Sequence, residues 1–304
     1  MRFSRLLLAA LLLSSLPSLA QKEVLYSQYL VNPMAINPAF AGVREDFTMT
    51  LAFRGRLFSF LSQNSQQVAT PITQTFAADG QLGTGHFGLG FQVLNDRTST
   101  LGNVGLSTNL SYRIDLPNLS RLFIGVQGGV NILPIIGTGT SLGGSSALLS
   151  YGLGVYYDAE KFFAGVSAPE LKSQAFGLGG FRYRQPVYVQ AGARLDLTDA
   201  FKLIPSVVLS RAGNEPMGVD LNARLWYRSK AAAGVSARQS NTFTNGTFNY
   251  VQATLEYQLS GNIRLGYLFN SVAPEAPFFS FQPTIHELVF RYTPNPNPLK
   301  FSYF

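Results

Sequence analysis

The chain has 304 residues, of which 46% are hydrophobic and only 13% charged, with 29 glycines and no cysteine. Two ordinary soluble domains would carry about twice this charged fraction, and no stretch after the first residues is apolar for the ~18 residues that a membrane-spanning helix needs. The formal net charge is +7, but the basic residues form no cluster, so we expect no nucleic-acid binding.

Residues 1–20 have the features of a bacterial secretory signal peptide. Arg2 and Arg5 precede an apolar run over residues 6–13, and Ser18-Leu19-Ala20 is a small-x-small cleavage site. We therefore expect a mature chain that begins at Gln21. Because the chain has no cysteine, it can carry neither a lipoprotein anchor nor a disulfide, and export ends in the periplasm or in the outer membrane.

Residues 21–46 differ from everything that follows them. The pairs Asn32-Pro33 and Asn37-Pro38 initiate turns and remove backbone donors, so the sequence predicts neither strand nor helix here. We expect this segment on the periplasmic side or inside the mouth of a barrel. Two roles stay open for it, a tether that seals the lumen and a docking segment for a partner.

The stretch 247–272 shows the pattern that dominates residues 47–294. Val251, Leu255 and Tyr257 alternate with polar residues such as Gln252 and Glu256, and a turn at 260–262 leads into a second alternating run. Such runs predict a hairpin with one apolar and one polar face. Each run is about 10 residues long, enough for a tilted strand to cross a bilayer.

The same pattern predicts an all-β fold, a transmembrane antiparallel up-and-down β-barrel of about 14 strands with both termini periplasmic. Residues 295–304 follow the last strand as a periplasmic tail. The predicted strands begin near Phe47, Thr73, Phe87, Gly105, Arg121, Ser150, Lys161, Pro186, Phe201, Gly218, Ala231, Thr247, Asn262 and Thr284.

The connections between these strands alternate between two kinds. Tight turns are predicted at 117–120, 158–160, 198–200, 229–230 and 260–262, with a moderately short one at 81–86. Longer segments rich in Gly, Ser, Gln and Pro are predicted at 59–72, 134–149, 169–185 and 273–283. Outer-membrane barrels have short periplasmic turns and longer external loops, so this alternation also predicts the orientation.

Charged residues fall on the polar face of the predicted strands and predict a hydrated or salt-bridged lumen, because a charge on the lipid side at mid-bilayer costs about 2–4 kcal/mol. The main lumen charges are Arg113, Arg194, Arg224, Arg264, Glu256 and Arg291. Tyrosines near strand ends are expected in the two interfacial girdles: Tyr112, Tyr156, Tyr157, Tyr227, Tyr257 and Tyr292.

No catalytic, metal or cofactor site is predicted. Residues 83–88 match G-x-G-x-x-G, but a strand follows them, so they form a glycine-rich turn and no nucleotide site. His86 and His286 are the only histidines, which makes a structural zinc site implausible. His286 beside Glu287 could serve as the base of a hydrolase, but no local motif supplies a nucleophilic serine. We therefore expect that the protein is not an enzyme.

The start of the mature chain contains a motif made up of Gln28, Tyr29, Asn32, Pro33, Asn37, Pro38, Ala39 and Gly42. This motif resembles the opening of the PorP/SprF family of type IX secretion membrane proteins. The resemblance continues at residues 95–97, 150–171 and 205–206 and at the motif His286-Glu287-Leu288 of the last predicted strand. The sequence differs from the family pattern at residues 53–60, where the Trp that is usual in the family is replaced.

The resemblance implies an outer-membrane accessory or anchoring component of the type IX secretion system of Bacteroidota. It implies a role in the export or surface retention of adhesin-type cargo, in some members linked to gliding motility. The implied partners are outer-membrane lipid, periplasmic ring and peptidoglycan-binding components, and the cargo, with no nucleic acid. The alternative from the residues alone is a passive, porin-like diffusion channel.

Overall fold

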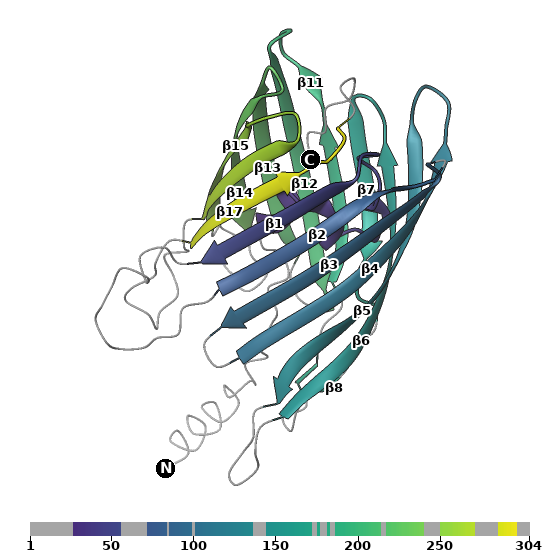
Figure 1. Ribbon diagram of the computed structural model, residues 1–304, viewed down its shortest axis with the longest axis vertical. Helices are drawn as coiled ribbons and strands as arrows, with labels where there is room; N and C mark the ends of the chain where they lie inside the picture. Colours follow the sequence, from purple (N-terminus) through teal and green to yellow (C-terminus); the bar gives the residue numbers. More distant parts are fainter. Residues whose placement is uncertain are drawn as a thin grey trace, which may run out of the picture.

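The structure is a computed structural model that describes residues 27–55, 72–83, 85–98, 101–135, 144–171, 175–176, 181–182, 186–213, 217–239, 250–270 and 285–296. Fourteen antiparallel barrel strands pair mainly in chain order and close on themselves (Figure 1). This confirms the predicted fold class. Among the helices of the described residues, none is both long and apolar enough to cross a membrane.

The first half of the barrel consists of β1 (Thr48–Gly55), β2 (Ile72–Leu82), β3 (Phe87–Thr98), β4 (Leu101–Asp115), β5 (Arg121–Ile135), β6 (Gly144–Asp158) and β7 (Phe162–Ala168). The second half consists of β10 (Pro186–Ala193), β11 (Leu195–Asp196), β12 (Phe201–Ala212), β13 (Gly218–Tyr227), β14 (Ala231–Gln239), β15 (Tyr250–Gln258), β16 (Ile263–Asn270) and β17 (Ile285–Tyr292). A separate two-stranded sheet pairs β8 (Ala175–Phe176) with β9 (Phe181–Arg182).

Two pairings complete the ring. The first strand lies antiparallel to the last, with Met49 of β1 opposite Tyr292 of β17. Strand β10 pairs with β7 on one side and with β12 on the other. Since β10 and β11 both pair with β12 and only Arg194 separates them, they form one interrupted barrel strand.

Most strands begin within one residue of the predicted position, and β4, β6 and β15 are the exceptions. Strand β4 begins at Leu101 and β6 at Gly144, several residues before the predicted starts. The predicted connection 134–149 is therefore shorter than expected, and Pro134 of β5 pairs with Ser145 of β6. The ladder is held by backbone groups, so it continues into Gly- and Ser-rich segments that show no apolar alternation.

The tight turns gather at one end of the barrel, which we call the tight-turn end. Residues 83–86, 116–120, 159–161, 197–200, 228–230 and 259–262 connect strands there. The longer connections fall at the opposite end. The predicted connections 59–72 and 273–283 lie almost entirely outside the described residues.

The outer face of the barrel is apolar, as the alternation predicts. In β15, Val251 and Leu255 are 51% and 57% exposed, whereas Gln252 and Glu256 between them are only 4% exposed. Apolar side chains that face water would be costly over such an area, so this exposed surface is the lipid face. Further large outward residues include Leu51, Leu106, Leu110, Val126, Leu153, Val189, Leu221 and Leu288.

The inner face is less polar than the sequence predicts. Tyr156 is 1% exposed and lies inside the barrel, so its predicted place in an interfacial girdle is wrong. Its neighbour Tyr157 occupies the outer face and stacks on Phe162, because consecutive strand residues face opposite sides. Other buried aromatic side chains of the barrel strands are Phe123, Phe163, Tyr188 and Trp226.

Candidate functional site

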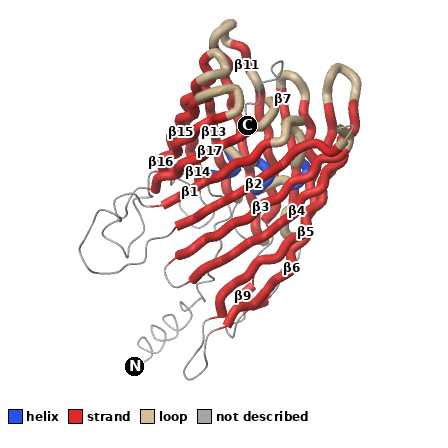
Figure 2. The backbone as a smooth tube through the Cα atoms, viewed as in Figure 1, coloured by secondary structure: helices blue, strands red, loops and turns tan. Residues whose placement is uncertain are grey.

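The segment that precedes β1 runs inside the barrel and forms the candidate functional site. We call its described part, residues 27–46, the plug. It contains three single turns of 3-10 helix, η1 (Ser27–Leu30), η2 (Pro33–Ala35) and η3 (Pro38–Phe40). Figure 2 shows these turns in blue within the ring of red strands.

The short helical turns correct the prediction that this segment contains no helix. Pro33 and Pro38 each stand at the start of a turn, where the missing N–H has no intrahelical partner to lose and the fixed φ suits the helix. Asn37 caps the last turn, because its side-chain oxygen accepts a hydrogen bond of 3.0 Å from the Ala39 N–H.

The plug supplies much of the hydrophobic core of the molecule. Met34, Ala39, Phe40 and Ala41 are all fully buried at 0% exposure. They belong to one cluster with residues of the barrel wall, namely Phe123, Tyr156, Phe163, Ile204, Trp226 and others. The Phe40 ring meets Tyr156 edge to face, with centroids 5.3 Å apart. Plug and barrel therefore share one core.

Glycines of the wall let the plug backbone come close. A Cβ atom added at Gly88 would collide with the carbonyl oxygen of Ala41, and one at Gly125 would collide with the backbone of Ala39. Gly42 has a φ of +73°, which favours glycine. A Cβ there would lie 2.8 Å from Gly88 Cα, so both partners need to be glycine.

Two asparagines of the motif bind the wall through their side chains. Asn37 is 0% exposed and donates from Nδ2 to the carbonyl oxygen of Val155 in β6, 3.1 Å away. Asn32 donates from Nδ2 to Gln92 Oε1 at 2.9 Å. Gln92 in turn donates to the Met34 carbonyl oxygen at 3.1 Å. These bonds satisfy polar groups that would otherwise be buried without partners.

The plug contacts the wall toward both ends of the barrel. Tyr29 donates to Asn222 Oδ1 at 3.1 Å and packs with Tyr188, which lies near the start of β10 and thus toward the long connections. At the other end Glu45 forms an ion pair with Arg121, the first residue of β5, beside a tight turn. The remaining part of the predicted segment, residues 21–26, and the side chain of Gln28 lie outside what the structure describes.

A buried ion pair fixes the plug where it leaves the lumen. Arg44 Nη1 lies 2.8 Å from Asp79 Oδ1 of β2, and the two side chains are 3% and 1% exposed. The Gly42 N–H donates to the other oxygen of Asp79 at 3.2 Å. The sequence analysis does not single out Asp79, because the residues around it in β2 do not alternate regularly between apolar and polar.

Four of the predicted charges lie around the plug in the lumen. Arg224 donates to the Leu30 carbonyl oxygen at 3.2 Å and pairs with Glu256 at 3.0 Å. Arg291 donates to the Val31 carbonyl oxygen at 2.5 Å. Arg264 lies 3.8 Å from Glu256 Oε2. Arg224 and Arg291 of the wall thus bind backbone carbonyl groups of the plug.

The other two predicted charges lie at the tight-turn rim. Arg194 bonds Asp158 at 2.6 Å, and Asp158 also pairs with Arg121. Arg113 pairs with Asp115 at 3.0 Å, where the Asp115 side chain is 53% exposed. These groups surround the exit of the lumen rather than its middle.

His286 and Glu287 do not form a catalytic pair. His286 lies on the outer side of β17, with Nδ1 2.5 Å from the Tyr267 hydroxyl and its ring against Phe269. Glu287 points inward and is 0% exposed. Among the described residues, no group of three metal-ligating side chains is present.

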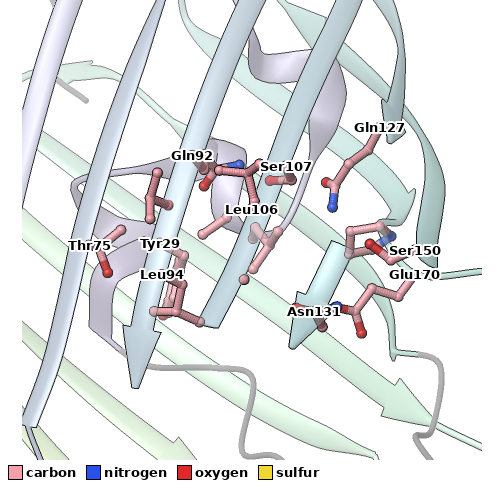
Figure 3. Close-up of a pocket in the computed structure, with 15 residues that line it drawn as sticks. Tyr29, Thr75, Gln92, Leu94, Leu106, Ser107, Gln127, Asn131, Ser150 and Glu170 are labelled. Atoms are coloured by element: carbon pink, nitrogen blue, oxygen red, sulfur yellow. The ribbon is translucent and has the colours of Figure 1, made fainter. Parts of the chain in front are cut away.

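A cavity of about 100 Å³ lies between the plug and the wall, and Figure 3 shows the residues that line it. Tyr29 and Ile36 of the plug line it together with polar wall residues such as Gln127 and Asn131. Glu170 also lines it, because the chain after β7 folds inward, and the Leu171 N–H donates to the Tyr151 carbonyl oxygen at 2.7 Å. Sequence reasoning placed residues 169–171 in an external loop.

The closed barrel, its apolar outer face and its occupied lumen define a plugged transmembrane β-barrel. The chain belongs to the family of type IX secretion system membrane proteins PorP/SprF, whose model matches residues 18–292. Family and fold together indicate an outer-membrane location.

Among curated protein sequences, none matches the chain. Among solved structures, it is similar to the outer membrane protein Omp33 of Acinetobacter baumannii, with 9% identity, a TM-score of 0.49 and coverage of 82% of this chain and 99% of the other. It is also similar to the KdgM porin, with 8% identity, a TM-score of 0.39 and coverage of 81% and 98%. Likeness at this level says nothing about function.

Proposed function

We propose that this protein is a non-enzymatic accessory or anchoring barrel of the type IX secretion system, which helps the export or surface retention of cargo without being the conduit. The observation that carries this proposal is the plug. Its side chains share the core of the molecule with the wall, and its backbone is hydrogen-bonded to wall side chains on several strands.

The proposal keeps the partners that the family resemblance implies. These are periplasmic ring and peptidoglycan-binding components on one side of the membrane, and a secreted adhesin-type cargo, with a link to gliding motility. It also includes a signal peptide over residues 1–20 for delivery to the outer membrane. The filled lumen counts against the passive diffusion channel that the sequence alone leaves open.

A disulfide that locks the plug tests whether the lumen is the conduit. The chain has no cysteine, so Ala41→Cys with Gly90→Cys would introduce a single thiol pair. A Cβ at Gly90 lies 3.2 Å from the Ala41 Cβ, close to the spacing of about 3.5–4.5 Å that a disulfide needs. The flexible Met34 thioether must move aside.

Cargo in the medium and on the surface is measured in cells that lack the native gene and carry the locked variant. Each single-cysteine variant is the control for the substitution itself. Under the proposal, oxidised and reduced cells export equally, while cells without the protein export poorly. If cargo export stops only in the oxidised double variant, the lumen is the conduit. If cells without the protein export cargo normally, the protein has no role in secretion.

A further inference from the structure

A second cavity opens at the tight-turn end and has the character of an anion site. Its volume is about 60 Å³. Three arginines from three separate segments line it: Arg44 of the plug, Arg264 of β16 and Arg291 of β17. The other lining residues include Asp46, Gly261, Asn262, Thr293 and Pro296.

Hydrogen bonds to neighbouring residues fix the three arginine side chains. Arg44 uses Nη1 on Asp79 and Nη2 on the Val31 carbonyl oxygen at 3.0 Å. Arg291 donates to the same carbonyl oxygen, and Arg264 Nε donates to Gln258 Oε1 at 2.8 Å. Guanidinium groups fixed in this way lose little conformational freedom when they bind a ligand.

The lining of the cavity is rich in guanidinium groups and hydrogen-bond donors. Arg44 Nε is buried and has no acceptor among the residues that the structure describes, and its side chain is only 3% exposed. Asp79 and Glu256 lie against Arg44 and Arg264. Among the described residues that line the cavity itself, Asp46 is the one carboxylate beside three guanidinium groups. A buried donor without an acceptor is unfavourable, and an oxyanion at this place would supply one.

We propose that this cavity binds a single oxyanion from the periplasmic side, either free phosphate or the carboxylate of an acidic peptide segment. Both present oxygens that guanidinium groups bind with paired, charge-assisted hydrogen bonds. Of the lining residues, Asn262 belongs to the last tight turn and Thr293 directly follows β17, so the cavity faces the compartment that the tight turns face. The proposal does not depend on the role in secretion.

The protein contains its own reporter for this site. Trp226 is the only tryptophan, and the guanidinium carbon of Arg264 lies 4.8 Å from the centre of its ring. An anion that binds Arg264 changes the charge next to the indole. We therefore expect a saturable change in tryptophan fluorescence when the oxyanion binds.

The experiment uses the full mature chain, purified and folded in detergent. Inorganic phosphate and an acetylated, amidated hexapeptide of glutamate are titrated separately, with chloride at equal ionic strength as the control for screening. Arg291→Gln removes one lining guanidinium but leaves the Arg264–Trp226 contact, so binding should weaken about tenfold. Arg228→Gln is the matched control, because Arg228 is exposed and lies outside the cavity lining.

A second pair of variants leaves every arginine in place. A Cβ at Gly261 meets nothing closer than Pro296 Cγ at 3.9 Å, so Gly261 tolerates a side chain. Gly261→Glu offers a competing carboxylate at the mouth and should weaken binding about tenfold, whereas the neutral Gly261→Gln should not. A heat-sensitive shift in gel mobility checks that each variant is folded.

The site is supported if the fluorescence change saturates with phosphate or with the peptide, and if this saturation is lost in Arg291→Gln and Gly261→Glu but kept in both controls. The ligand that saturates identifies the source of the oxyanion. The proposal is overturned if neither ligand saturates, or if chloride at equal ionic strength gives the same response. It is also overturned if the folded Arg291→Gln and Gly261→Glu variants bind as well as their controls.

Discussion

Arg44 of the plug and Asp79 of β2 form an ion pair of 2.8 Å with both side chains almost completely buried. Such a pair is costly to break from one side, because the remaining charge is left uncompensated in the interior. The plug is therefore part of the folded barrel rather than a segment that visits an open lumen.

Asp79→Ala should destabilise the folded protein by about 3–5 kcal/mol, because it leaves Arg44 buried without its carboxylate. Asp115→Ala is the matched control, since its pair with Arg113 lies at the exposed rim and should contribute less than about 1 kcal/mol. Denaturant unfolding, followed by loss of the compact form in gels, measures both. Equal effects of the two substitutions would show that the Arg44–Asp79 pair does not hold the plug.

Phe40→Ala should also be costly, by about 3–5 kcal/mol, because it empties the centre of the shared core. Phe162 provides the comparison, since its ring is 51% exposed on the outer face, and Phe162→Ala should change stability much less in detergent. The same unfolding experiment compares them. A small effect at Phe40 would mean that the plug does not pack against Tyr156 as described.

Gly125→Val should push the plug from its seat, because the new side chain would collide with the backbone of Ala39. Gly128 lies on the same strand, is exposed and has nothing within 4 Å of a Cβ, so Gly128→Val should be harmless. Swelling of liposomes in small sugars measures the opening. We expect swelling with Gly125→Val only, and a folded Gly125→Val barrel that stays closed would contradict the close contact.

Leu255→Arg should impair assembly into the membrane, at a cost of about 2–4 kcal/mol, because Leu255 faces lipid near the middle of β15. Leu259 is 60% exposed but lies in the tight turn after that strand, where an arginine costs only about 0–1 kcal/mol. The yield of folded barrel in lipid vesicles compares the two variants. Comparable yields would place the membrane elsewhere along β15.

The barrel was predictable because its evidence is local. Alternation of Val251 and Leu255 with Gln252 and Glu256 repeats every two residues, and turns such as 260–262 interrupt it visibly. The same rule misplaced Tyr156, because the sequence does not show that Phe40 fills the lumen beside it.

The candidate site was harder to predict because its contacts join residues far apart in the chain. Asn37 and Pro38 stand out in the sequence, but nothing local indicates that Asn37 bonds Val155 or that Gly125 must be small for Ala39. Asp79 lies on a strand with weak alternation. Such partners become evident only when the ring of strands is closed around the plug.

The central claim is that residues 27–46 close the lumen of the folded barrel, and electrical recording of the full mature chain in a planar bilayer tests it most directly. The account predicts inserted barrels without steady conductance across the voltage range, and conductance after Gly125→Val. Stable ohmic conductance from the unmodified protein would contradict it.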